Sequence, residues 1–236
     1  MNLLEVMERL SEAAEGVVVP NDLWVYNPLR HAQTSHNLYL ERWGEGKKEV
    51  LLVGMNPGPW GMVQTGVPFG SVGMVRDFLG IEEEVFRPER EHPKRPVLGF
   101  SCPREEVSGA RLWGWVRERW GRPKPFFERF FVHNLCPLAF MEESGKNLTP
   151  NLLPSPSREE IAHVCQTALR EVVAVLSPEW VVGIGVWAER QAQIALNGLD
   201  INIGRILHPS PASPVANRGW APQAEARLDA LGIQIP

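Results

Sequence analysis

The chain has 236 residues, of which 44% are hydrophobic, and it carries a formal net charge of −4 at pH 7. A chain of this length can form one α/β domain with a sizeable core, and we expect residues 1–236 to form a single domain. No apolar run approaches the roughly 20 residues that a membrane-spanning helix needs, so we expect no membrane partner. The 3 cysteines are too few and too widely spaced for a disulfide framework, a zinc site or a four-cysteine iron–sulfur cluster, so we expect no metal and no cofactor.

The predicted elements alternate between helices and strands along the chain. The segment Met1–Gly16 has apolar residues at helical spacing with acids between them, which is typical of an amphipathic helix rather than a signal peptide. Short apolar runs bounded by turn residues predict buried strands at Glu49–Met55, Arg129–Leu135, Glu179–Val186 and Ile201–His208. Helices are expected at Ser71–Leu79, Ser108–Trp120, Ser157–Leu176, Trp187–Asn197 and Pro222–Leu231. This order predicts an α/β fold with three layers, α/β/α, around a central, mostly parallel four-stranded sheet.

Three local patterns refine this prediction. Ser157 and Glu160 have the spacing of a capping box at the start of the long helix. Residues Glu82–Pro103 are rich in charge and proline, which indicates an irregular excursion. The stretch Gly183–Ala188 matches the G-x-G-x-x-A pattern of dinucleotide sites, but the acid that should end the next strand is missing. Close packing of a helix against a strand is the alternative explanation for these glycines.

Two segments have the composition of a ligand pocket: Gly54–Gly70, the first loop, and His208–Trp220, the second loop. Both are dense in glycine, proline and asparagine, and each follows a predicted strand. Open α/β sheets bind their ligands where strands end in such loops. Three predicted strands run into a polar residue, namely Asn56, Asn134 and His208. Because parallel strands end at one edge of a sheet, we expect these three side chains to meet in one cleft.

The chemistry of this predicted pocket is neutral. Neither loop contains an Asp, Glu, Lys or Cys, so we expect amides, one imidazole, backbone N–H groups and an aromatic ring to act without a carboxylate. Such a pocket suits a flat, uncharged ligand such as a nucleobase. An asparagine side chain can accept a hydrogen bond from uracil N3–H and donate one to O4, whereas cytosine presents the opposite pattern.

Arginines gather in one part of the chain, although the overall charge is acidic. They lie at Arg111, Arg117, Arg119, Arg122 and Arg129, together with Lys124. Arginine suits bidentate contacts to phosphate. An ordinary solvated helix face explains the same cluster, since acids alternate with the arginines.

Three motifs resemble one known family. They are GMNPGPWGMVQTGVPFG at 54–70, HNLCPL at 133–138 and HPSPASPVANRGW at 208–220. In order and spacing they resemble the single-strand-selective monofunctional uracil-DNA glycosylases of the uracil-DNA glycosylase superfamily, and the resemblance extends over most of the chain. It implies an enzyme of base excision repair that flips uracil out of DNA and hydrolyses its N-glycosidic bond, leaving an abasic site. It also implies uracil-containing DNA, single- or double-stranded, as the partner, and action as a monomer. Activity on 5-hydroxymethyluracil, xanthine and hypoxanthine stays open.

The resemblance assigns roles to individual residues. It implies that Asn56 positions the water that attacks the sugar C1′, and that His208 hydrogen-bonds uracil O2 as negative charge builds on the leaving base. Phe69 then stacks on the extruded base, and Asn134 reads its N3/O4 edge.

The resemblance also places the pocket wall and the DNA contacts. The backbone around Met55 and Gly58 lines the pocket near C5 of the base. DNA contacts are expected from Pro209, Ser210, Pro211, Ala212, Ser213, Pro214, Asn217 and Arg218. Some family members carry a basic wedge residue in place of Ala212, which puts strong intercalation in doubt here. Arg205 and Arg218 are the alternative phosphate contacts.

A glycosylase of this type is expected to lack lyase activity. That activity needs an amine that forms a Schiff base, and the lysines lie outside the motifs, at Lys47, Lys48, Lys94, Lys124 and Lys146. Two other functions stay open: a non-catalytic protein that binds damaged DNA, and a hydrolase of free nucleosides. The cysteine content fits a reducing cytoplasm, with association to the nucleoid in a prokaryote or a nuclear location in a eukaryote.

Overall fold

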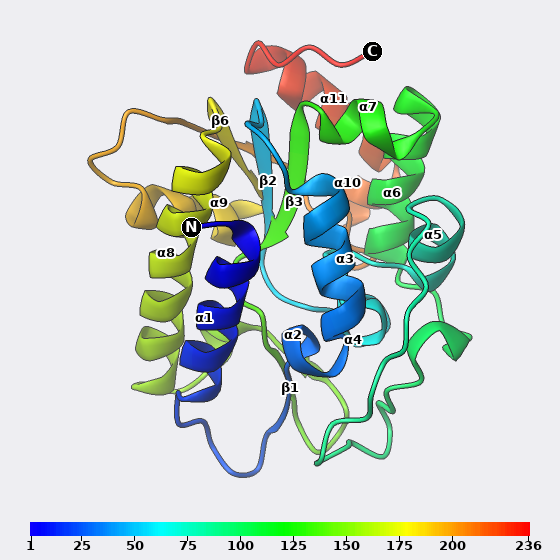
Figure 1. Ribbon diagram of the computed structural model, residues 1–236, viewed down its shortest axis with the longest axis vertical. Helices are drawn as coiled ribbons and strands as arrows, with labels where there is room; N and C mark the ends of the chain where they lie inside the picture. The colour runs from blue at the N-terminus through cyan, green and yellow to red at the C-terminus, as the bar shows by residue number, and fades with distance from the viewer.

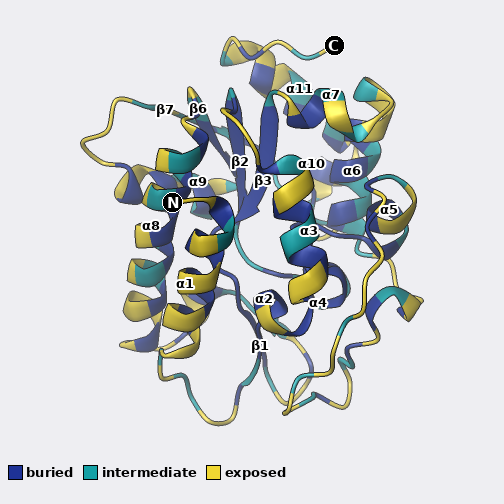
Figure 2. Ribbon diagram, viewed as in Figure 1, coloured by how far each residue is buried: buried dark blue, intermediate teal, exposed yellow.

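Four parallel strands form the centre of the molecule, in a computed structural model that describes all residues 1–236. Their order in the sheet is β3-β2-β6-β7 (Figures 1 and 2). The strands are β2 (Val50–Gly54), β3 (Phe130–Asn134), β6 (Trp180–Ile184) and β7 (Asn202–Ile206). All four strands predicted from the sequence are confirmed, each one to two residues shorter at its ends, and the sheet is parallel throughout.

Burial on both faces explains why these strands are so apolar. Every residue of β2 and β3 is buried, as expected for a parallel sheet that helices cover on both sides. The edge strand β7 is different, because its residues alternate between buried and partly exposed positions. The sheet therefore has one well-covered edge at β3 and one more open edge at β7.

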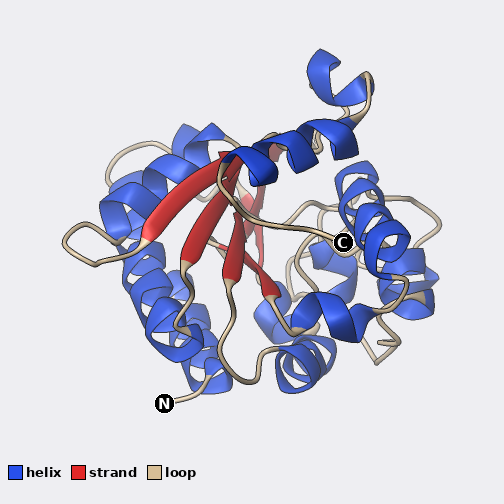
Figure 3. Cartoon of the chain, turned by 90° about the horizontal axis from the view of Figure 1, so that it is seen from above, coloured by secondary structure: helices blue, strands red, loops and turns tan.

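Helices form the layers on either side of this sheet (Figures 1 and 3). One layer contains α1 (Leu3–Glu15), α3 (Gln33–Trp43), α8 (Ser157–Leu176) and α9 (Val186–Ala195). The other contains α6 (Val107–Trp120), α7 (Pro123–Phe127) and α11 (Trp220–Ala230). Figure 2 shows that the long helices bury the side that faces the sheet and expose the opposite side. The predicted three-layer α/β/α fold is confirmed.

Short elements complete the fold. The helices are α2 (Pro28–His31), α4 (Met62–Thr65), α5 (Val72–Asp77) and α10 (Pro214–Asn217), with 3₁₀ turns at Gly99–Ser101 and Pro150–Leu152. The segment Glu82–Pro103 is irregular apart from the first of these turns, as predicted.

A second, smaller sheet was not predicted from the sequence. It is antiparallel, in the order β1-β4-β5, and consists of β1 (Trp24–Tyr26), β4 (Ala139–Met141) and β5 (Asn147–Leu148). Its strands are too short to show a period of two residues, which is why the sequence pattern did not reveal them. Because β4 follows β3 closely, this sheet lies beside the carboxyl ends of the main strands.

The predicted capping box at Ser157 is wrong. Helix α8 begins at Ser157 itself, its N-cap is Pro156, and no side-chain capping bond forms. Instead, the Ser155 hydroxyl donates a hydrogen bond to the Glu159 carboxylate. The proline before the serine occupies the cap, so the serine enters the first turn, where its hydroxyl cannot cap the helix. A capping box does form in α1, between Asn2 and Glu5.

Close packing accounts for Gly183 in the G-x-G-x-x-A stretch. A Cβ atom at Gly183 would lie 2.3 Å from the backbone nitrogen of Glu189 in α9. Gly185 has a positive φ of 99° and directs the chain from β6 into α9. The alternative explanation, tight contact between helix and strand, is therefore sufficient for the first of these glycines.

Candidate active site

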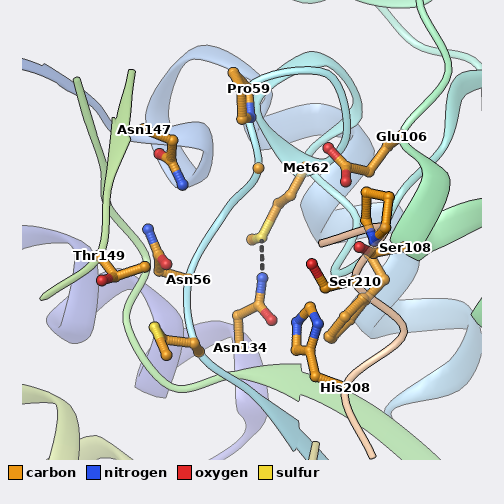
Figure 4. A pocket seen from close by; sticks show the side chains of 14 residues that line it. Asn56, Pro59, Met62, Glu106, Ser108, Asn134, Asn147, Thr149, His208 and Ser210 are labelled. Atoms are coloured by element: carbon orange, nitrogen blue, oxygen red, sulfur yellow. Dashed lines mark hydrogen bonds between the residues drawn. The ribbon is translucent and has the colours of Figure 1, made fainter. Parts of the chain in front are cut away.

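The carboxyl ends of the parallel strands meet at one cavity of about 360 Å³, a size typical of small-ligand sites. Strand β2 leads to Asn56, β3 ends at Asn134, and β7 leads to His208, and all three side chains line this cavity (Figure 4). The structure thus brings together the residues expected to converge. The other lining residues are Met55, Gly58, Pro59, Met62, Phe69, Glu106, Ser108, Asn147, Thr149, Ser210 and Pro211.

Asn134 presents a free hydrogen-bond acceptor. Its Nδ2 donates to the thioether sulfur of Met62 at 3.3 Å, while its Oδ1 is buried without a partner. A Cβ atom at Gly54 would lie 2.3 Å from this Oδ1 and 2.4 Å from the Phe69 ring, so only glycine fits beside them. A buried unpaired acceptor is costly, and a ligand N–H at this position would satisfy it.

Phe69 forms one wall of the cavity and has an unusual backbone. Its φ is 54°, in the left-handed region that residues other than glycine rarely adopt. Its ring lies 5.8 Å from the His208 ring, centroid to centroid. A Cβ atom at Gly109 of α6 would lie 1.9 Å from the Phe69 carbonyl oxygen. This close approach of α6 holds the strained residue in place.

His208 is neutral at physiological pH. Burial lowers the pKa of its imidazole to about 4, because desolvation disfavours the charged form. A Cβ atom at Gly185 would lie 3.4 Å from the His208 Cβ, so the segments that follow β6 and β7 are in van der Waals contact here. A neutral imidazole offers one N–H donor and one acceptor to the cavity.

Asn56 lies on the opposite side of the cavity from His208, close to Asn147 and Thr149 (Figure 4). Its Nδ2 donates to the backbone carbonyl of Leu138 at 3.2 Å, which fixes the orientation of the amide. The Oδ1 of Asn147 is buried without a partner. Sequence reasoning missed Asn147 and Thr149, because they belong to β5 and its neighbourhood in the small sheet that was not predicted.

The expectation of a cavity without a carboxylate is wrong, because Glu106 lines it. This residue comes from the N-terminus of α6, outside both loops, so the composition of the loops could not reveal it. Desolvation raises the pKa of its carboxyl, and backbone hydrogen bonds from Ser108 and Trp60 oppose the shift. A Cβ atom at Gly58 would lie 2.5 Å from Glu106 Oε2, so the carboxyl group packs against the first loop.

The second loop leaves β7 and folds over α6. Pro211 and Ala212 at its tip are exposed, as is Arg218. The Asn217 amide is used inside the loop, since its Nδ2 donates to the Pro211 carbonyl at 2.9 Å. Arg205 donates to Glu189 at 2.9 Å, so it is paired within the protein. Of the two alternative phosphate contacts, Arg218 is the exposed one.

Three members of the arginine cluster are bonded within the protein. Arg119 pairs with Glu225 at 2.6 Å, and Arg129 pairs with Glu49 at 2.6 Å. Arg111 instead donates three hydrogen bonds to the second loop, two of them to the carbonyls of Pro209 and Ser210. Neither a phosphate-binding patch nor a plain solvated face describes all of these residues.

Some kinds of site are absent from the structure. No group of three or more His, Cys, Asp or Glu side chains is arranged to hold a metal ion. No residue that lines the cavity is a lysine. None of the helices combines the length and the apolar character that crossing a membrane requires.

Comparisons with known proteins agree on one family. Residues 42–228 match the Uracil DNA glycosylase superfamily. The chain is 53% identical over 211 residues to the "single-strand selective monofunctional uracil-DNA glycosylase" of Rattus norvegicus, covering 89% of this chain and 76% of the relative. Its counterpart in Bos taurus is 51% identical, with 89% and 78% covered. The crystal structure of SMUG2 from Pedobacter heparinus superposes with a TM-score of 0.65 at 14% identity, covering 97% of this chain and 99% of that chain, which shows the same fold.

Proposed function

Because the chain belongs to the uracil DNA glycosylase superfamily, we propose that it removes uracil from DNA and acts as a monofunctional glycosylase. Relatives that are 51% to 53% identical over 211 residues carry this activity in their names. DNA is therefore its substrate class. The product is an abasic site, and the reaction is a hydrolysis of the bond between the base N1 and the sugar C1′.

The Asn134 amide supports recognition of uracil rather than cytosine. With Nδ2 directed to Met62 and Oδ1 unpaired, the acceptor is free for the N3–H of uracil. Cytosine has no N3–H and would leave this buried oxygen unsatisfied, at a cost of about 1–3 kcal/mol. Phe69 supplies the ring on which the extruded base stacks.

Neutral His208 suits the stabilisation of the leaving base. Uracil departs as an anion whose charge is spread over O2, N1 and O4, so the C1′–N1 bond can break before water attacks. One donor aimed at a developing anion is worth roughly 10²–10³ in rate, by analogy with oxyanion holes. The lowered pKa keeps the ring uncharged, and it donates through one N–H without first having to gain a proton.

Asn56 completes the reaction by placing the attacking water. Its Nδ2 is held by the Leu138 carbonyl, so its Oδ1 is the acceptor left for that water. The sugar cation that forms when uracil leaves needs only a positioned water, not a strong base. The absence of a lysine from the cavity lining supports hydrolysis without a following lyase step.

The finer aspects of the proposal concern the DNA and the cell. We propose that the chain acts as a monomer on single-stranded uracil DNA, and more weakly on duplex DNA because Ala212 gives the exposed tip no large side chain to fill the gap left by a flipped base. Flipping costs a few kcal/mol, and less where the uracil is unpaired. The location proposed is the cytoplasm, at the nucleoid of a prokaryote, or the nucleus of a eukaryote.

The unpaired Oδ1 of buried Asn134 beside neutral His208 is the observation that carries this proposal. The test incubates the protein with single-stranded and duplex oligonucleotides that contain one uracil, in the presence of EDTA. We expect alkali-labile abasic sites at uracil only, and none with an Asn56→Ala, His208→Ala double variant. Tight binding without base release would instead indicate a damage-binding protein, and turnover of free deoxyuridine alone would indicate a nucleoside hydrolase.

A further inference from the structure

Arg111 joins α6 to the second loop through one guanidinium group. Its Nη1 donates to the backbone carbonyls of Pro209 at 3.2 Å and Ser210 at 3.3 Å. Its Nη2 donates to Oδ1 of Asn217 at 2.8 Å. These partners lie near the beginning and the end of the loop, so a single side chain ties both limbs of it to the helix.

Asn217 extends this connection across the loop. While its Oδ1 accepts from Arg111, its Nδ2 donates to the carbonyl of Pro211 at 2.9 Å. Its amide is therefore satisfied at both ends by the protein. The segment that follows His208 is held by a chain of hydrogen bonds that starts at Arg111, although most of its residues are exposed.

The first turn of α6 is also fixed to the first loop. Glu106 packs against Gly58 and Gly61, where a Cβ atom would lie 2.5 Å and 2.8 Å from its side-chain atoms. Gly109 lets the helix approach the carbonyl of Phe69. Within one and a half turns, the same helix contacts both loops that supply the walls of the cavity.

We propose that Arg111 is a positioning residue. Its hydrogen bonds hold the second loop, and with it the His208 imidazole, at the distance from the first loop that catalysis requires. Its guanidinium bonds the residue immediately after His208, so a shift of this bond moves the imidazole directly. The kinetic part of this proposal rests on the proposed glycosylase function. No contact between Arg111 and the base is required.

The competing explanation is that Arg111 binds a DNA phosphate. The two explanations differ in their response to salt and to lysine. A lost phosphate contact reduces the slope of log affinity against log salt by about 0.7 on single-stranded DNA. A lysine keeps the charge but, as a single ammonium group, cannot bond two carbonyls and an amide in the geometry of a guanidinium.

The test measures single-turnover rates and dissociation constants for Arg111→Ala, Arg111→Lys and Asn217→Ala on single-stranded uracil DNA. Arg227→Ala is the control, because Arg227 is an exposed arginine near the far end of α11 with no bond to the loop. We expect both Arg111 variants to lose roughly 10- to 100-fold in rate, as for a misplaced catalytic group. The salt slope should stay unchanged, and the control should match the unmodified protein.

Two further measurements separate positioning from misfolding and from the proposed function. Hydrogen exchange should become faster at residues 209–217 in Arg111→Ala and stay unchanged in β2 and β3, whether or not the protein cleaves DNA. In the double variant with Asn217→Ala, the rate should fall no further than in Arg111→Ala alone, because the two residues act as one unit. Rescue by lysine together with a reduced salt slope in Arg111→Ala, or unchanged exchange in the loop, would overturn the proposal.

Discussion

The two loops of the site are held in place in different ways. The first loop is buried from Gly61 to Gly70 (Figure 2), and its glycines face atoms that leave no room for a side chain. At Gly66, for example, a Cβ atom would lie 2.6 Å from the Ala32 carbonyl oxygen. The second loop is mostly exposed and is held at separate points by hydrogen bonds, such as Trp220 Nε1 to the Leu207 carbonyl at 2.6 Å.

The first loop is therefore shaped by close packing, whereas the second loop is shaped by a few polar contacts. Packing resists change, because every neighbour must move together. A hydrogen-bonded loop can be altered one contact at a time. The first loop should therefore fail as a unit, through loss of stability, whereas the second should lose activity in steps while the fold persists.

The largest effect should come from His208→Ala. We expect the single-turnover rate on uracil DNA to fall roughly 10²- to 10³-fold, since one donor to the developing anion is lost. The melting temperature should change little, because the His208 side chain lines the cavity rather than the core of the sheet. A rate within threefold of the unmodified protein would remove His208 from the mechanism.

Low pH should destabilise the fold through two buried histidines beside the first loop. Burial lowers the pKa of His36 to about 4 and that of His133 to about 3. Because these values lie below the unfolded value of about 6.5, this contribution to stability is fully present above pH 6.5. It is lost as the pH falls from 6.5 towards 4, and each histidine then lowers the free energy of unfolding by about 1.4 kcal/mol per pH unit.

Urea unfolding between pH 8 and pH 4 measures this loss. His36→Gln is the matched variant, because glutamine can still donate to the Gly66 carbonyl that His36 contacts at 2.7 Å but cannot gain a charge. Its stability should depend less on pH over this range. An equal dependence in both proteins would contradict the assignment.

Gly54→Ala should lower both the stability of the protein and its affinity for uracil. The added methyl group would collide with Asn134 Oδ1 and the Phe69 ring, and such overpacking costs about 1–3 kcal/mol. Uracil binding should weaken as the unfolding free energy falls. Gly114→Ala in α6 is the control, since a Cβ atom there meets nothing within 4 Å, and it should stabilise the helix by about 0.5–1 kcal/mol.

Ala212→Arg should have a smaller effect. It should raise the affinity for duplex DNA only. The exposed tip has room for a guanidinium, which would stack against bases with about 0.5–1 kcal/mol. We expect roughly two- to fivefold tighter binding to a uracil-containing duplex and little change on a single strand. Competition binding with matched oligonucleotides measures the ratio, and an equal gain on both would indicate a plain charge effect.

The smallest expected effect is the response of the rate to pH. With the pKa of His208 near 4, the ring stays neutral from pH 6 to pH 8. Single-turnover rates should show no inflection near 6.5 in that range. A clear step there would mean that the imidazole titrates with an ordinary pKa and acts in its charged form.

The central sheet and the three converging side chains were predictable because they depend on local signals. Apolar runs mark β2, β3, β6 and β7, and each polar residue lies at the end of its strand or two residues after it. Glu106 and Arg111 were not, since each lies far along the chain from the loop that it contacts. The nearest signal was the helix start at Ser108, but nothing in a helix pattern says which loop will pack against its first turn.

Backbone geometry explains most of the remaining differences between the predicted and the observed structure. The role of Gly54 depends on its register opposite Asn134, which no single sequence displays. The strands of the small sheet hold two or three residues each, too few for a pattern, so Asn147 stayed hidden with them. Ser157 shows the reverse case, a correct motif spacing that the preceding proline makes inoperative.

The position of β7 at the open edge of the sheet has an evolutionary consequence. His208 and the segment after it leave a strand that has only one neighbour, β6, whereas Asn56 leaves β2, which is paired on both sides. Insertions or substitutions after β7 need not disturb any other strand. Mutations at exposed residues of this segment, such as Ala212, can therefore be accepted without disturbing the paired strands that place Asn56 and Asn134.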